Sequence, residues 1–116
     1  MSAPSTLSVA VVGSGGSGVI TAGSLLLDAA ARARFYGLMT RSHGPQIRGG
    51  EAAAFVRLGR VPVEAPADGV DLLVALGWKG TERFEAELRL GPASVVLSDG
   101  AAGEPPPSVS GSRADL

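Results

Sequence analysis

The first apolar segment of the chain is a short run rich in β-branched residues, Leu7 to Val12, that ends at a cluster of glycines. Such a run followed by glycines is typical of a buried strand and a tight turn. From Ser17 to about Arg34, small and apolar residues then recur at helical spacing in an alanine-rich stretch. The pattern therefore predicts a strand, a turn and a helix at the start of the chain.

The middle of the chain changes pattern twice. Phe35 to Thr40 is a second short apolar run, and it leads into Ser42 to Gly50, a segment too rich in glycine and proline for regular structure. We expect a loop there. From Glu51 to Leu58 the side chains alternate, which predicts a strand with one face more apolar than the other.

The last third contains shorter signals. Val61 to Val63 is expected at a sheet edge, because Pro62 cannot donate a ladder hydrogen bond. Val70 to Leu76 is almost continuously aliphatic, which predicts a strand buried on both faces. Thr81 to Leu88 is expected to form a short helix, and Val95 to Leu97 one more strand.

Strands that alternate with helices predict an α/β fold with some parallel pairing. We expect a three-layer α/β/α arrangement around a Rossmann-like sheet, either mixed or mostly parallel. The chain has 116 residues, which suits one hydrophobic core. We place one domain at residues 1–99, and we expect residues 100–116, rich in Pro, Gly and Ser, to form a mobile tail.

Composition excludes several classes of function. Ten basic residues against eleven acidic ones give a net charge of −1, so nucleic acid and anionic membranes are disfavoured as partners. The chain has no cysteine, which excludes a disulfide framework, a thiolate metal site and an iron–sulfur cluster held by this chain. No apolar run of about 18 residues and no basic segment before an apolar one is present, so we expect a soluble cytoplasmic protein without a membrane partner.

A glycine string marks the first candidate site. Gly13-Ser14-Gly15-Gly16-Ser17-Gly18 follows the pattern G-x-G-x-x-G between the first predicted strand and helix. Glycines there let backbone N–H groups approach an anion, and the helix N-terminus favours phosphate. Ser14 and Ser17 could add hydroxyl donors. The alternative is that the glycines only allow the helix to pack closely on the strand.

Two known phosphate-binding patterns fit this string poorly. A dinucleotide fingerprint needs an acidic residue about 20 positions later, where this chain reads Leu38-Met39-Thr40-Arg41. NAD is therefore disfavoured, although Arg41 could meet the extra phosphate of NADP. No Lys-Ser/Thr pair follows the last glycine, which excludes a P-loop.

Arg48 lies in the predicted loop and is followed by Gly49 and Gly50. Its guanidinium could bind a phosphate or a partner's carboxylate, and the alternative is a solvated arginine beside a turn. His43 has no identified acid, nucleophile or metal partner, so we give it no catalytic role. Trp78 is expected to cap a core or a subunit contact. We predict no catalytic residue and no metal ligand in this chain.

The two segments together resemble one family. The run from Gly13 to Gly23 and the Ser-x-Gly-Pro-x-x-Arg-Gly-Gly loop, Ser42 to Gly50, are similar to the gamma domain of 2-oxoacid:ferredoxin oxidoreductases, which act on pyruvate, ketoisovalerate or 2-oxoglutarate. The phrase from Tyr36 to Ser42 is similar to members with the gamma domain fused ahead of the alpha subunit. The resemblance extends from about Leu7 to Asp99.

By this resemblance the whole enzyme would decarboxylate a 2-oxoacid oxidatively, form an acyl-coenzyme A and pass electrons to ferredoxin. The chain would act only in a complex with alpha and beta subunits, which carry thiamine diphosphate and iron–sulfur clusters. It would contribute to subunit assembly and to the coenzyme A site. The resemblance places Ser14, Gly15, Gly16, Ser17, Gly18, Arg48, Gly49 and Gly50 at that site.

Family gamma domains continue well beyond the strand that ends near Leu97, so residues 1–99 are interpreted as an incomplete gamma domain. A truncated product, a cut fragment and a divergent stand-alone form all fit this ending. Two other functions stay open: an α/β protein that binds NADP or a flavin through the glycine turn, and a purely structural assembly module.

Overall fold

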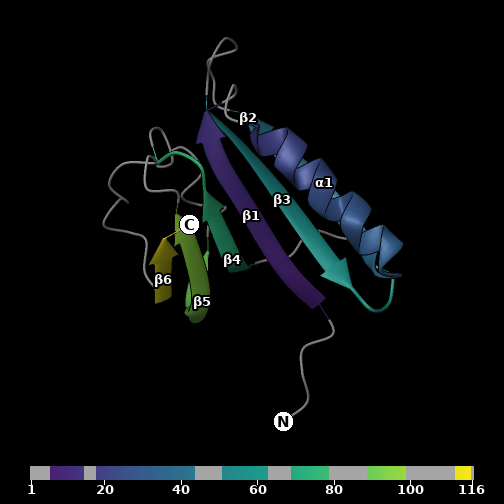
Figure 1. The fold of residues 1–116 in the computed structure, drawn as a ribbon. Coiled ribbons are helices and arrows are strands. Elements are labelled where there is room, and N and C mark those ends of the chain that lie inside the picture. Colours follow the sequence, from purple (N-terminus) through teal and green to yellow (C-terminus); the bar gives the residue numbers. More distant parts are fainter. Residues whose placement is uncertain are drawn as a thin grey trace.

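The computed structural model describes residues 6–14, 18–43, 51–62, 69–78, 89–98 and 112–115. Within these ranges the chain forms one helix and a twisted sheet (Figure 1). The elements in chain order are β1 (Thr6–Ser14), α1 (Val19–Arg32), β2 (Tyr36–His43), β3 (Glu51–Gly59), β4 (Val70–Ala75), β5 (Leu90–Ser98) and β6 (Ser112–Asp115).

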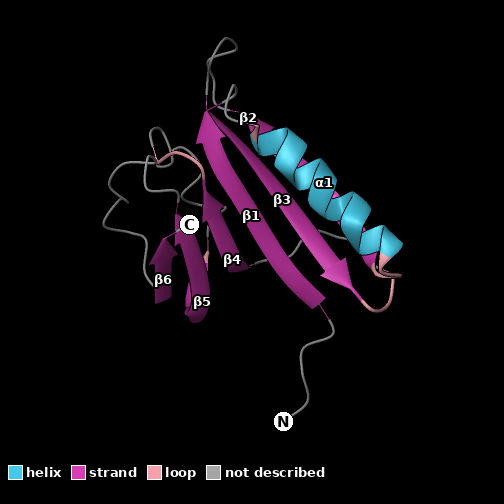
Figure 2. Cartoon of the chain, in the orientation of Figure 1, coloured by secondary structure: helices cyan, strands magenta, loops and turns pink. Residues whose placement is uncertain are grey.

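The sheet is mixed, with strand order β2-β3-β1-β4-β5-β6. β3 is antiparallel to both of its neighbours, β1 and β2, whereas β1, β4, β5 and β6 are parallel to one another. The helix α1 crosses one face of the sheet, over β1, β2 and β3 (Figure 2). The predicted α/β fold with a mixed sheet is thus confirmed, and the expected helix at 81–88 lies outside the described residues.

The α1 face of the sheet is held by an aliphatic core, which includes Val9, Val11, Val19, Ala54 and Val56. Gly23 lets the helix lie close to the sheet. A Cβ atom on Gly23 would lie 2.9 Å from the Sδ of Met39 and 3.0 Å from the Cβ of Ala54. Because the Ala54 side chain cannot rotate away, any larger residue at Gly23 would push the helix off β3.

The helix α1 ends at Arg32 and is followed by a Schellman motif. The N–H of Phe35 donates to the carbonyl of Ala30 at 2.9 Å, and the N–H of Arg34 donates to the carbonyl of Ala31 at 3.1 Å. Arg34 has a φ of 68°, the left-handed conformation that this motif requires after the helix. The predicted helix end near Arg34 is therefore close to the observed end at Arg32.

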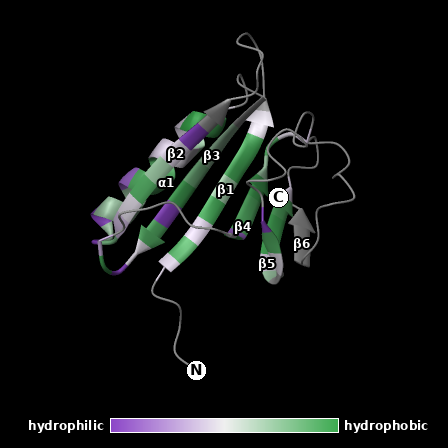
Figure 3. Cartoon of the chain, turned by 180° about the vertical axis from the view of Figure 1, so that it is seen from behind, coloured by the Kyte–Doolittle hydropathy of each residue, from purple (hydrophilic) through white to green (hydrophobic). Residues whose placement is uncertain are grey.

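The opposite face carries a second core. Its buried members are Ala10, Val12, Ala53, Val70, Leu73, Ala75, Trp78 and Val96. Figure 3 shows the middle of β1 and β4 in the colours of hydrophobic residues. Leu73 of β4 is fully buried, and Leu72 and Val74, which point to the other face, are half-buried. β4 is therefore buried on this face and only half-buried on the α1 face, so the predicted burial on both faces is confirmed for one face alone.

Several element boundaries differ from the sequence prediction because pairing partners extend the strands. Ser42 and His43, expected in a loop, belong to β2 because they pair with Ala53 and Ala52 of β3. Val61 and Pro62 are not in a strand, so the predicted edge strand is wrong for these residues.

Ser112–Asp115 lie in the segment whose composition predicts a tail, yet they form β6 and pair with β5 from Val95↔Ser112 to Ser98↔Asp115. These residues are therefore part of the sheet. The domain division at residue 99 stays a prediction.

Candidate functional site

The glycine turn lies where β1 ends and α1 begins. β1 ends at Ser14, and α1 begins at Val19 after the N-cap residue Gly18. Gly18 has φ 88° and ψ 18°, a left-handed conformation that glycine adopts without the strain of a side chain. Gly15, Gly16 and Ser17 lie outside the described residues, as does the side chain of Ser14. The predicted change from strand to helix across this turn is confirmed.

The N-terminus of α1 has the electrostatic features of an anion site. Gly18 provides no side chain to cap the first N–H groups, and the first turn contains no acidic residue that would compete with an anion. The helix is 14 residues long, so its N-terminal dipole is developed. A bound phosphate or carboxylate would be stabilised here by both backbone N–H groups and the dipole.

The second candidate segment connects β2 to β3 in the sequence. β2 ends at His43 and β3 begins at Glu51, so Arg48, Gly49 and Gly50 lie outside the described residues. The two loops have neighbouring stems, because Ser14 at the end of β1 pairs directly with Glu51 at the start of β3. Neighbouring strands lie about 4.8 Å apart. Both loops therefore leave the sheet at the same edge, which is the upper end of β1 in Figure 1.

The residues after β4, Leu76 to Trp78, complete this edge. The N–H of Leu76 donates to the carbonyl of Val12 at 2.9 Å, and a Cβ on Gly77 would lie 3.8 Å from the Cα of Gly13. Trp78 is 4% exposed, and its Nε1 donates to the Oγ of Ser98 at 3.1 Å. Trp78 thus caps the core below the edge, as predicted, and Gly77 is the neighbour of the turn that only the fold reveals.

Strand order argues against a dinucleotide site. In a doubly wound dinucleotide-binding sheet the second strand lies beside the first, so that its end reaches the ribose. Here β3 lies between β1 and β2, and it is antiparallel to both. Arg41 is exposed on β2 and pairs with Ala54 of β3, which places it one strand further from the glycine turn than a ribose-binding residue would be.

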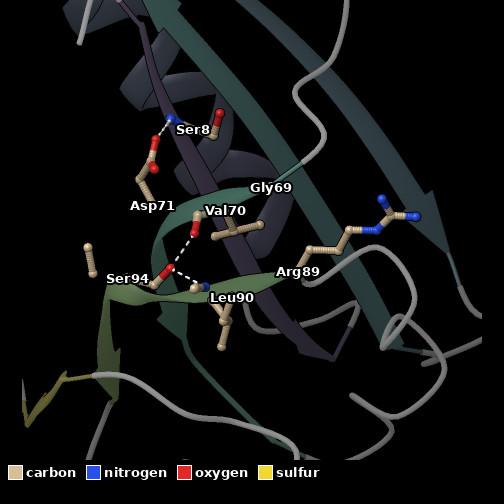
Figure 4. Close-up of a pocket in the computed structure, with 9 residues that line it drawn as sticks. Ser8, Gly69, Val70, Asp71, Arg89, Leu90 and Ser94 are labelled. Atoms are coloured by element: carbon tan, nitrogen blue, oxygen red, sulfur yellow. Dashed lines mark hydrogen bonds between the residues drawn. The ribbon is translucent and has the colours of Figure 1, made fainter.

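A cavity of about 460 Å³ opens at the other edge of the sheet, near the starts of β1, β4 and β5 (Figure 4). Several of its polar groups bond to one another. The hydroxyl of Ser94 donates to the carbonyl of Val70 at 2.7 Å and accepts from the N–H of Gly91 at 2.9 Å. Asp71 Oδ2 accepts from the N–H of Ser8 at 2.8 Å. These bonds tie the strand starts together, so we interpret this cavity as structural.

The described parts of the chain also bear on metal binding and on membrane insertion. No group of three or more His, Cys, Asp or Glu residues in these ranges is arranged to hold a metal ion. No described helix is long and apolar enough to cross a membrane.

A family model for pyruvate ferredoxin/flavodoxin oxidoreductases matches residues 8–115, almost the whole chain. The chain belongs to this family. The match includes both candidate loops and β6, and it confirms the family indicated by the two glycine-rich segments of the sequence.

Curated relatives of this chain include the 2-oxoglutarate synthase subunit KorC of Methanothermobacter thermautotrophicus, 33% identical over 93 residues, which are 78% of this chain and 49% of that subunit. The indolepyruvate oxidoreductase subunit IorB of Archaeoglobus fulgidus is 38% identical over 72 residues, covering 60% of this chain and 35% of that one. The chain therefore spans about half the length of the KorC subunit, or less in the case of IorB.

Solved structures share the fold. The gamma subunit of a keto/oxoacid ferredoxin oxidoreductase from Geobacter sulfurreducens has a TM-score of 0.71 and 27% identity, over 97% of this chain and 59% of that subunit. The 2-oxoglutarate:ferredoxin oxidoreductase of Magnetococcus marinus, solved with 2-oxoglutarate, coenzyme A and succinyl-CoA bound, has a TM-score of 0.80 and 24% identity, over 96% of this chain and 20% of that one. The likeness to the second structure shows the fold alone.

Proposed function

We propose that this chain is the gamma-type module of a 2-oxoacid:ferredoxin oxidoreductase and that its glycine turn and Arg48 loop bind the phosphates of coenzyme A. The observation that supports the site is the pair Ser14↔Glu51, which makes the stems of the two loops neighbours at one sheet edge. The proposed site residues are Ser14, Gly15, Gly16, Ser17, Gly18, Arg48, Gly49 and Gly50.

The chemistry of the two loops suits a phosphate of coenzyme A. The N-terminus of α1, with no side-chain cap and no acidic residue in its first turn, supplies N–H donors and a positive dipole. Arg48 lies three residues before Glu51 in the sequence, and its planar guanidinium can bind a phosphate through two hydrogen bonds. Donors on two sides would hold the nucleotide end of the molecule while its thiol reaches a reaction centre elsewhere in the complex.

The reaction itself belongs to the complex. We propose that alpha and beta subunits carry the thiamine diphosphate and iron–sulfur clusters and pass electrons to ferredoxin, and that the complex is cytoplasmic. Iron–sulfur clusters need cysteine thiolates, and this chain has none. The chain is therefore not catalytic alone. We further propose that other subunits choose the 2-oxoacid, because relatives of this chain are named for different substrates, 2-oxoglutarate and indolepyruvate.

Coenzyme A titration of the reconstituted complex tests the site. Arg48→Ala should raise the Kd for coenzyme A about tenfold or more, because a hydrogen bond to a charged group contributes roughly 1.5–3 kcal/mol. Arg48→Lys should lose less, since the charge remains. The matched control is Arg41→Ala, which removes an exposed arginine from β2 and should leave this Kd unchanged.

The two alternatives give different results in the same experiment. A purely structural module would show unchanged coenzyme A affinity and weaker subunit association in Arg48→Ala. A protein that binds NADP or a flavin would be stabilised against heat by NADPH or the flavin and not by coenzyme A. NADPH stabilisation that is lost in Arg41→Ala would favour that function.

A further inference from the structure

Arg34 holds a strained backbone conformation at a position where glycine is favoured. Its φ of 68° places it in the left-handed region directly after α1, at the position of the Schellman motif that is usually glycine. A side chain in that region is strained by contact with its own carbonyl. Within the described ranges the exposed guanidinium of Arg34 takes part in no ion pair or hydrogen bond that would explain this choice. Strain retained without a structural benefit indicates a functional residue.

Exposed apolar side chains lie around Arg34. Phe35 and Tyr36 follow it directly and are 42% and 50% exposed. Tyr36 pairs with Gly59 at the end of β3, so the residues that follow α1 and the turn after β3 lie at the same corner of the sheet (Figure 1). Val61, two residues after Gly59, is also exposed. This end of the molecule thus presents aromatic and aliphatic surface to its surroundings.

Arginine and aromatic side chains together are the composition of a binding hot spot. Arg60 is exposed in the turn after β3 and, like Arg34, has no ion-pair partner among the described residues. Arg32, by contrast, pairs with Asp28 at 3.2 Å. We define the Arg34 surface as Arg34, Phe35, Tyr36, Arg60 and Val61. Two guanidinium groups beside apolar surface fit a partner that offers carboxylates beside apolar side chains.

We propose that the Arg34 surface docks a carboxylate-bearing surface of another subunit of the oxidoreductase. This inference rests on the proposed function, because that function supplies the partner. The net charge of −1 gives no general attraction for a polyanion such as nucleic acid, so a protein surface with a few acidic residues is the better occupant. The Arg34 surface lies at the end of the sheet opposite the glycine turn, so docking there leaves the coenzyme A site open.

The test uses Arg34→Gly, because it separates a docking role from a structural role. A docking role predicts a higher Tm together with weaker binding, whereas a structural role predicts a lower Tm and unchanged binding. Glycine relieves the strain, so the Tm of the isolated chain should rise by about 4 °C. Loss of the guanidinium should raise the Kd for the complex lacking this chain about tenfold, as for a hot-spot arginine. The probe is that complex, purified from the same organism after deletion of this chain, and binding is measured by surface plasmon resonance.

Three controls separate the outcomes. Arg34→Lys keeps the charge and should retain most of the affinity, and Arg41→Ala removes an exposed arginine elsewhere and should change neither measurement. Phe35→Ala/Tyr36→Ala should also weaken binding. Arg34→Gly with unchanged affinity overturns the docking surface while the proposed function stands. A wild-type chain that does not bind the probe overturns both.

Discussion

The two edges of the sheet use polar groups in opposite ways. At the edge where β4 and β5 begin, Ser94, Asp71 and backbone groups bond to one another, and the Ser94 hydroxyl serves as both donor and acceptor. At the edge where β1 ends, the N-cap of α1 is a glycine without a side-chain bond to the helix. Polar groups at the first edge are used for stability, whereas those at the second are suited to a ligand. The cavity at the first edge is lined by these mutually bonded groups.

The largest effect is expected at Trp78, the buried side chain beneath the glycine turn. Trp78→Ala should lower the free energy of unfolding by about 3–5 kcal/mol, because it removes a buried aromatic side chain from beneath the glycine turn. Urea denaturation followed by far-UV circular dichroism measures this loss. Trp78→Phe keeps most of the volume and loses the bond to Ser98, so it should cost much less. Equal costs for both variants would mean that the hydrogen bond, not packing, dominates.

The second prediction concerns the structural edge. Ser94→Ala should lower the free energy of unfolding by about 2 kcal/mol, because a buried hydroxyl with two hydrogen bonds is lost and two backbone groups lose their partner. The Kd of the reconstituted complex for coenzyme A should not change. A weaker affinity for coenzyme A would show that the two edges are not independent and would contradict the comparison above.

The third prediction returns to the glycine turn. Gly18→Ala should lower the free energy of unfolding by about 1 kcal/mol, because alanine is strained at φ 88°. A Cβ on Gly18 would meet no atom within 4 Å, so the cost is one of backbone conformation and not of a clash. Thermal denaturation of the isolated chain measures it. A loss several times larger would indicate that the turn is packed more tightly than this geometry allows.

The smallest effect is expected at Asp71, whose side chain is exposed. Asp71→Asn keeps an oxygen that can accept from the N–H of Ser8, so the free energy of unfolding should fall by less than about 1 kcal/mol. Asp71→Ala removes the acceptor and should cost more than Asp71→Asn. Amide hydrogen exchange at Ser8 reports the bond directly, and equally slow exchange in Asp71→Ala would exclude the bond.

Local patterns in the sequence were sufficient for the elements near the site. The apolar run from Leu7, the glycines after it and the helical spacing that follows predict β1, the turn and α1, because each pattern depends on neighbouring residues. The glycine-rich segments also identified the family. The tightness of helix packing at Gly23 could not be predicted, since it depends on Met39 and Ala54 from other strands.

What only the tertiary structure decided is which strands are neighbours. Alternation shows which side chains share a face of a strand, but it contains no information on the strand beside it. The insertion of β3 between β1 and β2, the pair Ser14↔Glu51 and the pairing of Ser112–Asp115 with β5 all depend on hydrogen bonds between distant residues. The sequence by itself determined the two segments of the candidate site, and the fold alone made the strands that flank them neighbours, because backbone pairing is nearly independent of side-chain identity.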